Sequence, residues 1–169
     1  AKKTLLANGC DDETASILSD LIRNAERDGS LSHGLFRLPA YVSGLKSGKI
    51  NGKGKPEVQK VSPSVIKVKG NNCLAPVVLS KGLPELAKAA KENGVAVLAI
   101  NNSHHMAAMW PETEKLAEEG LVAFACTSYK PAVAPAGAIK PLFGTNPISF
   151  AWPRPGKTPV VYDMATASM

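Results

Sequence analysis

From residue 57 onwards, predicted helices alternate with short apolar segments, and this alternation allows only a few folds. Residues 83–94 and 111–120 have helical spacing, with a proline near each start and a glycine at each end. The segments "VAVLAI" and "LVAFACTS" are continuously apolar, which is typical of buried strands. Further strands are predicted in "VSPSVIKVKG", as a pair or as one strand bent at Pro63, and in "KPLFGTNPISFAWP" and "TPVVYDMAT". This order of elements indicates an α/β fold.

The first 56 residues are predicted to be mainly helical. "DDETASILSDLIRNAERDG" has apolar residues on one face, acidic residues in its first turn and Gly29 as its stop. "LPAYVSGLKSG" is a second, short helix with Pro39 in its first turn. The Gly- and Lys-rich residues 47–56 mark the predicted boundary between a helical segment, 1–56, and an α/β segment, 57–169. The chain lacks both GxGxxG after a strand and GxxxxGK[ST], so neither a Rossmann nor a phosphate-loop site is expected.

Composition argues against several classes of protein. Apolar residues make up 44% of the chain and charged residues 20%, as in soluble proteins, and no apolar run approaches the ~20 residues that span a bilayer. The N-terminal residues lack the features of a signal peptide, so a cytoplasmic location is expected. The net charge of +6 comes from dispersed lysines, and aromatic residues are only 5%, so nucleic-acid binding is not expected. Cys10, Cys73 and Cys126 form no CxxC pair, which predicts reduced thiols and no metal site.

One segment of the first half carries three side chains suited to catalysis. In "DGSLSHGLFRLPAYV", Ser32 and His33 are adjacent and Arg37 follows about one turn later. An imidazole can give or take a proton near neutral pH, and a guanidinium can bind a carboxylate through two hydrogen bonds. Residue types alone leave an alternative open, in which Ser32 caps a turn, His33 packs and Arg37 is a surface charge.

Three other segments are candidates for ligand binding, and each has an ordinary structural alternative. "NNSHHMAAMWPETE" joins a strand to a helix, where α/β proteins place ligands, but it also fits one exposed and one core histidine. The turn "GTNP", residues 144–147, offers a hydroxyl and an amide or is simply a turn. Asp163 ends a predicted strand and could accept ribose hydroxyls, or Asp163 or Thr166 could cap a helix.

Taken together and in this order, these segments resemble the malate/L-lactate dehydrogenase family of NAD(P)-dependent oxidoreductases. The resemblance covers nearly the whole chain and includes "SHG…R" followed by "LFGTNPI". Within the family, "SHHMAAMWPETE" is most similar to the Δ1-piperideine-2-carboxylate/Δ1-pyrroline-2-carboxylate reductases. The resemblance implies a fold with a mixed sheet flanked by helices that is not a Rossmann fold, with residues 57–169 forming part of the cofactor-binding domain.

The resemblance also implies roles for individual residues. His33 would be the proton donor, Ser32 its charge-relay neighbour and Arg37 the ligand of the substrate carboxylate, while Thr145 would also contact the substrate. His105 is the alternative acid/base residue. The residues expected to contact the cofactor, NADPH or alternatively NADH, are Met106, Ala107, Ala108, Met109, Trp110, Asp163, Met164 and Ala165. A homodimer and a small carboxylate substrate are expected as well.

Three functions remain open at the level of sequence. The first is reduction of a cyclic 2-imino acid by NADPH to L-pipecolate or L-proline. The second is oxidation of a 2-hydroxy acid of the malate, lactate or ureidoglycolate type. Members of the family are about twice as long as this chain. The resemblance implies that an acidic residue completes the relay with Ser32 and His33, and in family members this residue comes a few positions after the one that matches Met169. The third reading is therefore a truncated chain, inactive alone, that at most binds a ligand or a partner.

Overall fold

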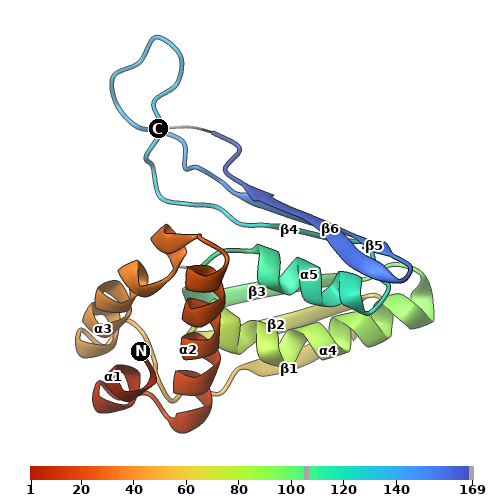
Figure 1. Cartoon of the computed structure of the whole chain (residues 1–169), viewed down its shortest axis with the longest axis horizontal. Helices are drawn as coiled ribbons and strands as arrows, with labels where there is room; N and C mark the ends of the chain where they lie inside the picture. Colours follow the sequence, from red (N-terminus) through yellow and green to blue (C-terminus); the bar gives the residue numbers. More distant parts are fainter. Residues whose placement is uncertain (105–106, 168–169) are drawn as a thin grey trace. The chain divides into compact units, whose positions relative to one another are not determined.

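The computed structural model describes residues 1–104 and 107–167. The chain divides into two compact units, Ala1–Ala107 and Ala108–Met169. Figure 1 shows helices at the start of the first unit, followed by a sheet, and a single helix with a second sheet in the other unit. The boundary predicted at residue 56 falls inside the first unit, and a division of the whole protein into domains at that point stays a prediction.

Three helices open the first unit: α1 (Lys2–Ala7), α2 (Asp12–Arg27) and α3 (Leu38–Lys46). Asp11 caps α2 by accepting the Thr14 N–H at 2.9 Å, and Asp12 and Glu13 in the first turn suit the positive end of the helix dipole. The predictions of α2 and α3 are confirmed. Helix α1 was not predicted, because its six residues are too short to show a hydrophobic period. The buried residues of the three helices and adjoining loops form one cluster: Leu5, Cys10, Ala15, Leu18, Ile22, Tyr41, Ile50 and Leu74.

The sheet of the first unit has the order β1–β2–β3. Its strands are β1 (Glu57–Ser62), β2 (Val65–Leu74) and β3 (Val97–His104). The first two strands form an antiparallel pair around Pro63, as one of the two predicted arrangements has it. Helix α4 (Ala75–Asn93) connects β2 to the parallel strand β3, and it runs along the sheet in Figure 1. A β-α-β unit of this kind is the expected result of alternating apolar strands and helices.

Two details of this sheet differ from prediction. Helix α4 begins at Ala75 and not at Leu83, because Pro76 occupies the first turn and the helix continues past Pro84. Strand β3 was predicted to be buried on both faces, but Val97 is 57% exposed. In the described chain α4 packs on one face of the sheet, so only alternate residues of β2 and β3 are covered. A short apolar run cannot distinguish burial on one face from burial on two.

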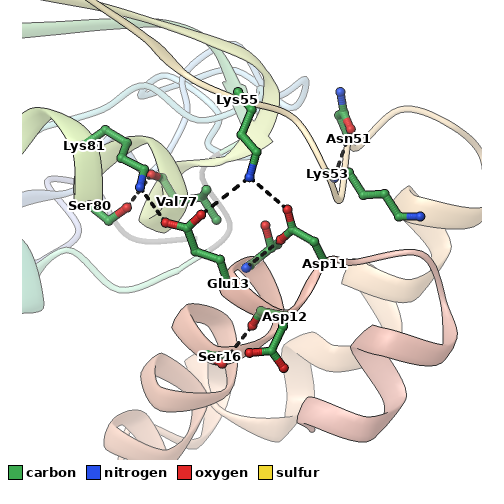
Figure 2. Close-up of polar contacts among 11 residues, drawn as sticks. Asp11, Asp12, Glu13, Ser16, Asn51, Lys53, Lys55, Val77, Ser80 and Lys81 are labelled. Carbon is green, nitrogen blue, oxygen red and sulfur yellow. Dashed lines mark hydrogen bonds and ion pairs between the residues drawn. The ribbon is translucent and has the colours of Figure 1, made fainter.

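An ion-pair network holds the start of α2 against two other segments of the first unit (Figure 2). Lys55 Nζ lies 3.1 Å from Asp11 and 3.5 Å from Glu13, and Lys81 of α4 pairs with Glu13 at 2.5 Å. The backbone N–H of Thr14, and then Lys55, lower the pKa of Asp11, while Lys81 lowers that of Glu13. These groups are largely solvent-exposed, so the network contributes little to stability and mainly favours one arrangement of the loop that carries Lys55.

The second unit consists of one helix and an antiparallel sheet of order β4–β5–β6. Its elements are α5 (Trp110–Glu118), β4 (Ala123–Cys126), β5 (Ile148–Arg154) and β6 (Lys157–Met164). Thr113 of α5 and Ser149 of β5 share a buried hydrogen bond of 2.7 Å, which joins the helix to the sheet. Phe124 is 61% exposed, so the prediction of a buried strand over residues 121–128 is wrong for the described chain, because α5 covers one face only.

No helix in the described ranges is both long enough and apolar enough to cross a bilayer. The three cysteines are free thiols; Cys10 and Cys73 are buried and Cys126 is exposed. Burial raises the pKa of the Cys10 and Cys73 thiols, as expected for inert core cysteines. Within residues 1–104 and 107–167, no group of three His, Cys, Asp or Glu side chains is arranged to hold a metal ion.

Candidate functional site

The Ser-His pair lies on two consecutive single-turn 3-10 helices that connect α2 to α3. The first turn, Leu31–His33, carries the serine and the histidine, and the second, Leu35–Arg37, ends in the arginine. Ser32 Oγ lies 3.0 Å from His33 Nδ1, and Ser30 Oγ lies 3.4 Å from the same nitrogen. A hydroxyl at this distance can select the tautomer and orient the ring. The structure thus brings Ser32 and His33 together as the sequence predicts.

Arg37 stands at the start of α3 with part of its guanidinium enclosed by protein. Its Nε is buried and has no hydrogen-bond partner within the described ranges. Burying a cationic donor without a partner is unfavourable, so this Nε is a candidate donor for a bound acceptor. Tyr41, one turn further along α3, is 1% exposed, and burial raises its pKa to about 12 despite the opposing effect of the Arg37 charge. A carboxylate is the planar anion that best matches a guanidinium.

The residues expected to contact a cofactor lie partly around the N-terminus of α5. Ala107, Ala108 and Met109 are buried, and Trp110 begins the helix. His105 and Met106 lie outside the described residues. Met164 and Ala165 are exposed at the end of β6, where backbone and side chain are accessible to a ligand. The contact of these residues with a cofactor stays a prediction.

The side chain of Asp163 caps a helix, as one of its sequence-based alternatives allowed, but the sequence did not indicate which helix. Its Oδ2 accepts the N–H groups of Met109, at 2.6 Å, and Trp110, at 3.0 Å. The residue therefore caps α5, a helix more than fifty positions earlier, and not a helix that follows it. This contact ties the end of β6 to the start of α5, the two segments of this unit that the family resemblance assigns to the cofactor.

Replacing Asp163 with alanine is expected to lower the free energy of unfolding by about 1–2 kcal/mol, the usual effect of removing a helix cap. Asp163→Asn, which keeps an oxygen acceptor, should lose less than half as much. Urea unfolding followed by circular dichroism measures the difference, with Asp20→Ala on the exposed face of α2 as control. Equal losses in the alanine and asparagine variants would contradict the capping role.

The turn that carries Thr145 is held by contacts from two directions. Thr166 donates its backbone N–H to the Thr145 carbonyl at 2.9 Å and its hydroxyl to the Asn146 carbonyl at 2.8 Å. The Asn146 side chain accepts the Tyr129 N–H at 3.1 Å, and Asn146 itself has a left-handed backbone, φ +39°. Gly144 is packed against the Tyr129 carbonyl so closely that no Cβ would fit. Thr166 thus stabilises this turn through two hydrogen bonds, and it does not act as the helix cap that the sequence left open.

Comparisons with known proteins identify the class to which this chain belongs. The malate/L-lactate dehydrogenase family model matches residues 1–169, and the chain belongs to that family. It is 46% identical over 162 residues to a Δ1-pyrroline-2-carboxylate/Δ1-piperideine-2-carboxylate reductase of Pseudomonas putida, covering 96% of this chain and 48% of that protein. The crystal structure of Δ1-piperideine-2-carboxylate reductase from Pseudomonas syringae pv. tomato matches with a TM-score of 0.94 and 43% identity, over 99% of this chain and 51% of that one.

One relative is named for a different activity. The (2R)-3-sulfolactate dehydrogenase (NADP⁺) of Chromohalobacter salexigens is 40% identical over 155 residues, or 92% of this chain and 46% of that protein. The chain spans about half the length of the curated relatives it matches. The expected family and fold class are therefore confirmed, and the Pseudomonas putida and Pseudomonas syringae proteins named above are reductases of the expected branch.

Proposed function

We propose that the complete protein reduces a cyclic 2-imino acid, Δ1-piperideine-2-carboxylate or Δ1-pyrroline-2-carboxylate, to L-pipecolate or L-proline. The observation that carries this proposal is the buried Nε of Arg37, which lacks a partner in the described structure and stands four residues after a hydrogen-bonded Ser-His pair. These groups supply a cation that can bind a carboxylate and a source of protons. A 2-imino acid uses both groups, whereas an imine without a carboxylate uses only the proton source. The similarity to relatives named as reductases of these two compounds supports the same substrate class.

The chemistry divides between the protein and its cofactor. When bound, the nicotinamide cofactor supplies a hydride to the carbon of the C=N bond. Arg37 holds the carboxylate through charge-assisted hydrogen bonds and so fixes the ring that carries the imine. His33 delivers the proton that the imine nitrogen requires, and Ser32 keeps the imidazole oriented through Nδ1. Thr145 is the further substrate contact that the family resemblance assigns.

The same proposal includes the cofactor, the oligomeric state, the cellular location and the domain boundary. The cofactor is NADPH, in line with the NADP⁺ in the name of the sulfolactate relative. Its contacts are proposed at Met106–Trp110 and Asp163–Ala165, with His105 as the alternative acid/base residue. The protein is proposed to act as a cytoplasmic homodimer. The 56/57 division is proposed as the boundary between the segment with the Ser-His/Arg site and the cofactor-binding α/β segment.

Consumption of NADPH by the complete protein tests this proposal against its main alternative. The expected result is a fall in absorbance at 340 nm with either cyclic imino acid, and at least tenfold lower kcat/KM with keto acids related to malate, lactate and sulfolactate. The second candidate function is oxidation of a 2-hydroxy acid by the same residues acting in reverse. The similarity to a sulfolactate dehydrogenase supports this alternative. If the complete protein converts 2-hydroxy acids and 2-keto acids but not the cyclic imino acids, the protein is a 2-hydroxy acid dehydrogenase and the proposed imine reduction is wrong.

A further inference from the structure

We propose that Glu26 is a positioning residue that sets the spacing between His33 and Arg37. The proposal rests on the function above, because it concerns the alignment of the same proton donor and carboxylate ligand. Glu26 lies in the last turn of α2, and its Oε1 accepts the backbone N–H of Leu35 at 2.7 Å. A carboxylate on an amide is a charge-assisted hydrogen bond, stronger than a bond between neutral groups.

The bonded N–H occupies a particular place in the segment. Leu35 is the first residue of the second 3-10 turn, and the first N–H groups of a helical turn lack partners within it. Two nearby N–H groups are satisfied locally: Gly34 donates to the Leu31 carbonyl and Arg37 to the Gly34 carbonyl. The Glu26 carboxylate therefore satisfies the N–H at the junction between the turn with His33 and the turn with Arg37.

Helix α2 holds the segment at two consecutive residues. The Ala25 carbonyl accepts the Ser30 N–H at 2.8 Å, just before the first turn, and Glu26 accepts the Leu35 N–H after it. The turn with His33 is thus fixed to the helix at both ends. Because α2 is anchored in the core through Leu18 and Ile22, it provides a rigid base for the segment.

Gly34 leaves the space that the Glu26 carboxylate occupies at this junction. Gly34 is buried, with φ −90° and ψ −133°, outside the usual helical and extended regions. A Cβ at this position would lie 2.7 Å from Glu26 Cδ, and closer still to Oε1. A larger residue would displace the carboxylate from the Leu35 N–H, so Gly34 and Glu26 act as a pair. Nothing in the sequence suggests this pair, because the two residues are eight positions apart across a helix end.

The spacing of the two turns bears directly on the proposed reaction. A substrate bound to Arg37 by its carboxylate presents its imine nitrogen at a fixed distance, and His33 must reach that nitrogen. A displacement of about 1 Å in such a geometry can lower a rate roughly 100-fold. Glu26 acts through the backbone that carries both functional residues, and not by contact with substrate or cofactor.

Glu26→Ala is expected to lower kcat of the complete protein by roughly 10- to 100-fold, with KM changing less than kcat. Glu26→Gln keeps an oxygen at the same reach, and should stay within roughly fivefold of the wild type, because the lost charge weakens the bond without removing it. Asp20→Ala removes a carboxylate elsewhere on α2, where it pairs with Arg23, and should leave kcat unchanged. Loss of activity in all three variants, or in none, would overturn the proposal.

A double-mutant cycle separates positioning from general stability. Gly34→Ala should cost more activity in the wild type than in the Glu26→Ala background, since the carboxylate that its Cβ displaces is absent there. Additive losses would contradict the proposed pair. Hydrogen exchange at the Leu35 amide gives a readout that needs no turnover: Glu26→Ala should accelerate it at least about tenfold. A wild type inactive on all substrates would refute the proposed function alone, whereas unchanged Leu35 exchange would refute the role of Glu26.

Discussion

His33→Ala is expected to lower kcat/KM for the cyclic imino acid by about 100- to 10,000-fold, the usual contribution of a general acid. The imidazole is the proton source in the proposed reaction, and a methyl group cannot replace it. Steady-state NADPH oxidation by the complete protein measures the loss. Because the alanine variant leaves Arg37 unchanged, inhibition by L-proline or L-pipecolate should stay within a few-fold of the wild type.

The two serines beside His33 provide a matched control for this prediction. Ser32→Ala should lower kcat about tenfold by releasing Nδ1, while Ser30→Ala, at the longer distance of 3.4 Å, should have a smaller effect. His105→Ala tests the alternative acid. Full activity in the His33→Ala variant, together with loss of activity in the His105→Ala variant, would identify His105 and not His33 as the proton donor.

Arg37→Lys is expected to raise KM for the imino acid about 10-fold, since a lysine ammonium keeps the charge but cannot form the two parallel hydrogen bonds of a guanidinium, and losing one charge-assisted bond of about 1.5 kcal/mol corresponds to that factor. The measurement is again steady-state kinetics of the complete protein. Arg27→Lys is the control, because Arg27 pairs with Asp28 on the surface at 2.7 Å and should leave KM unchanged. An unchanged KM in the Arg37 variant would contradict a carboxylate ligand at this position.

A substrate analogue without the carboxylate provides a second, independent test of the role of Arg37. Δ1-Piperideine, without the carboxyl group, should react poorly with the wild type. The Arg37→Ala variant should lose little further activity on it, because the bond that the substitution removes was never formed. A large additional loss on this compound would mean that Arg37 maintains structure and not substrate binding.

The sequence could predict those features of the fold that depend on neighbouring residues. Helix α2 was predicted because Asp11, Asp12 and Glu13 mark its start and its apolar face repeats every three to four residues. The Ser32–His33 contact was predictable because the two residues are adjacent. Family resemblance supplied the roles, since residue types alone slightly favoured an ordinary turn.

The features that sequence could not predict are contacts between distant segments. The Glu26–Leu35 hydrogen bond depends on the direction in which the chain leaves α2, and the Asp163 cap of α5 depends on the register of β6 against β5. The burial of Arg37 Nε depends on how α3 packs. Strands β3 and β4 were predicted to be buried on both faces because an apolar run carries no information on how many faces neighbours cover.

The central claim, reduction of a cyclic 2-imino acid at the Arg37/His33 site, is tested most directly by following isotope into the product. The complete protein is incubated with Δ1-piperideine-2-carboxylate and NADPH carrying deuterium at both C4 positions, and the amino acid formed is analysed by mass spectrometry. The predicted result is L-pipecolate with one deuterium at carbon 2, with formation strongly reduced in His33→Ala and Arg37→Ala. Absence of labelled pipecolate, with deuterium appearing instead at carbon 2 of a 2-hydroxy acid formed from a 2-keto acid, would contradict it.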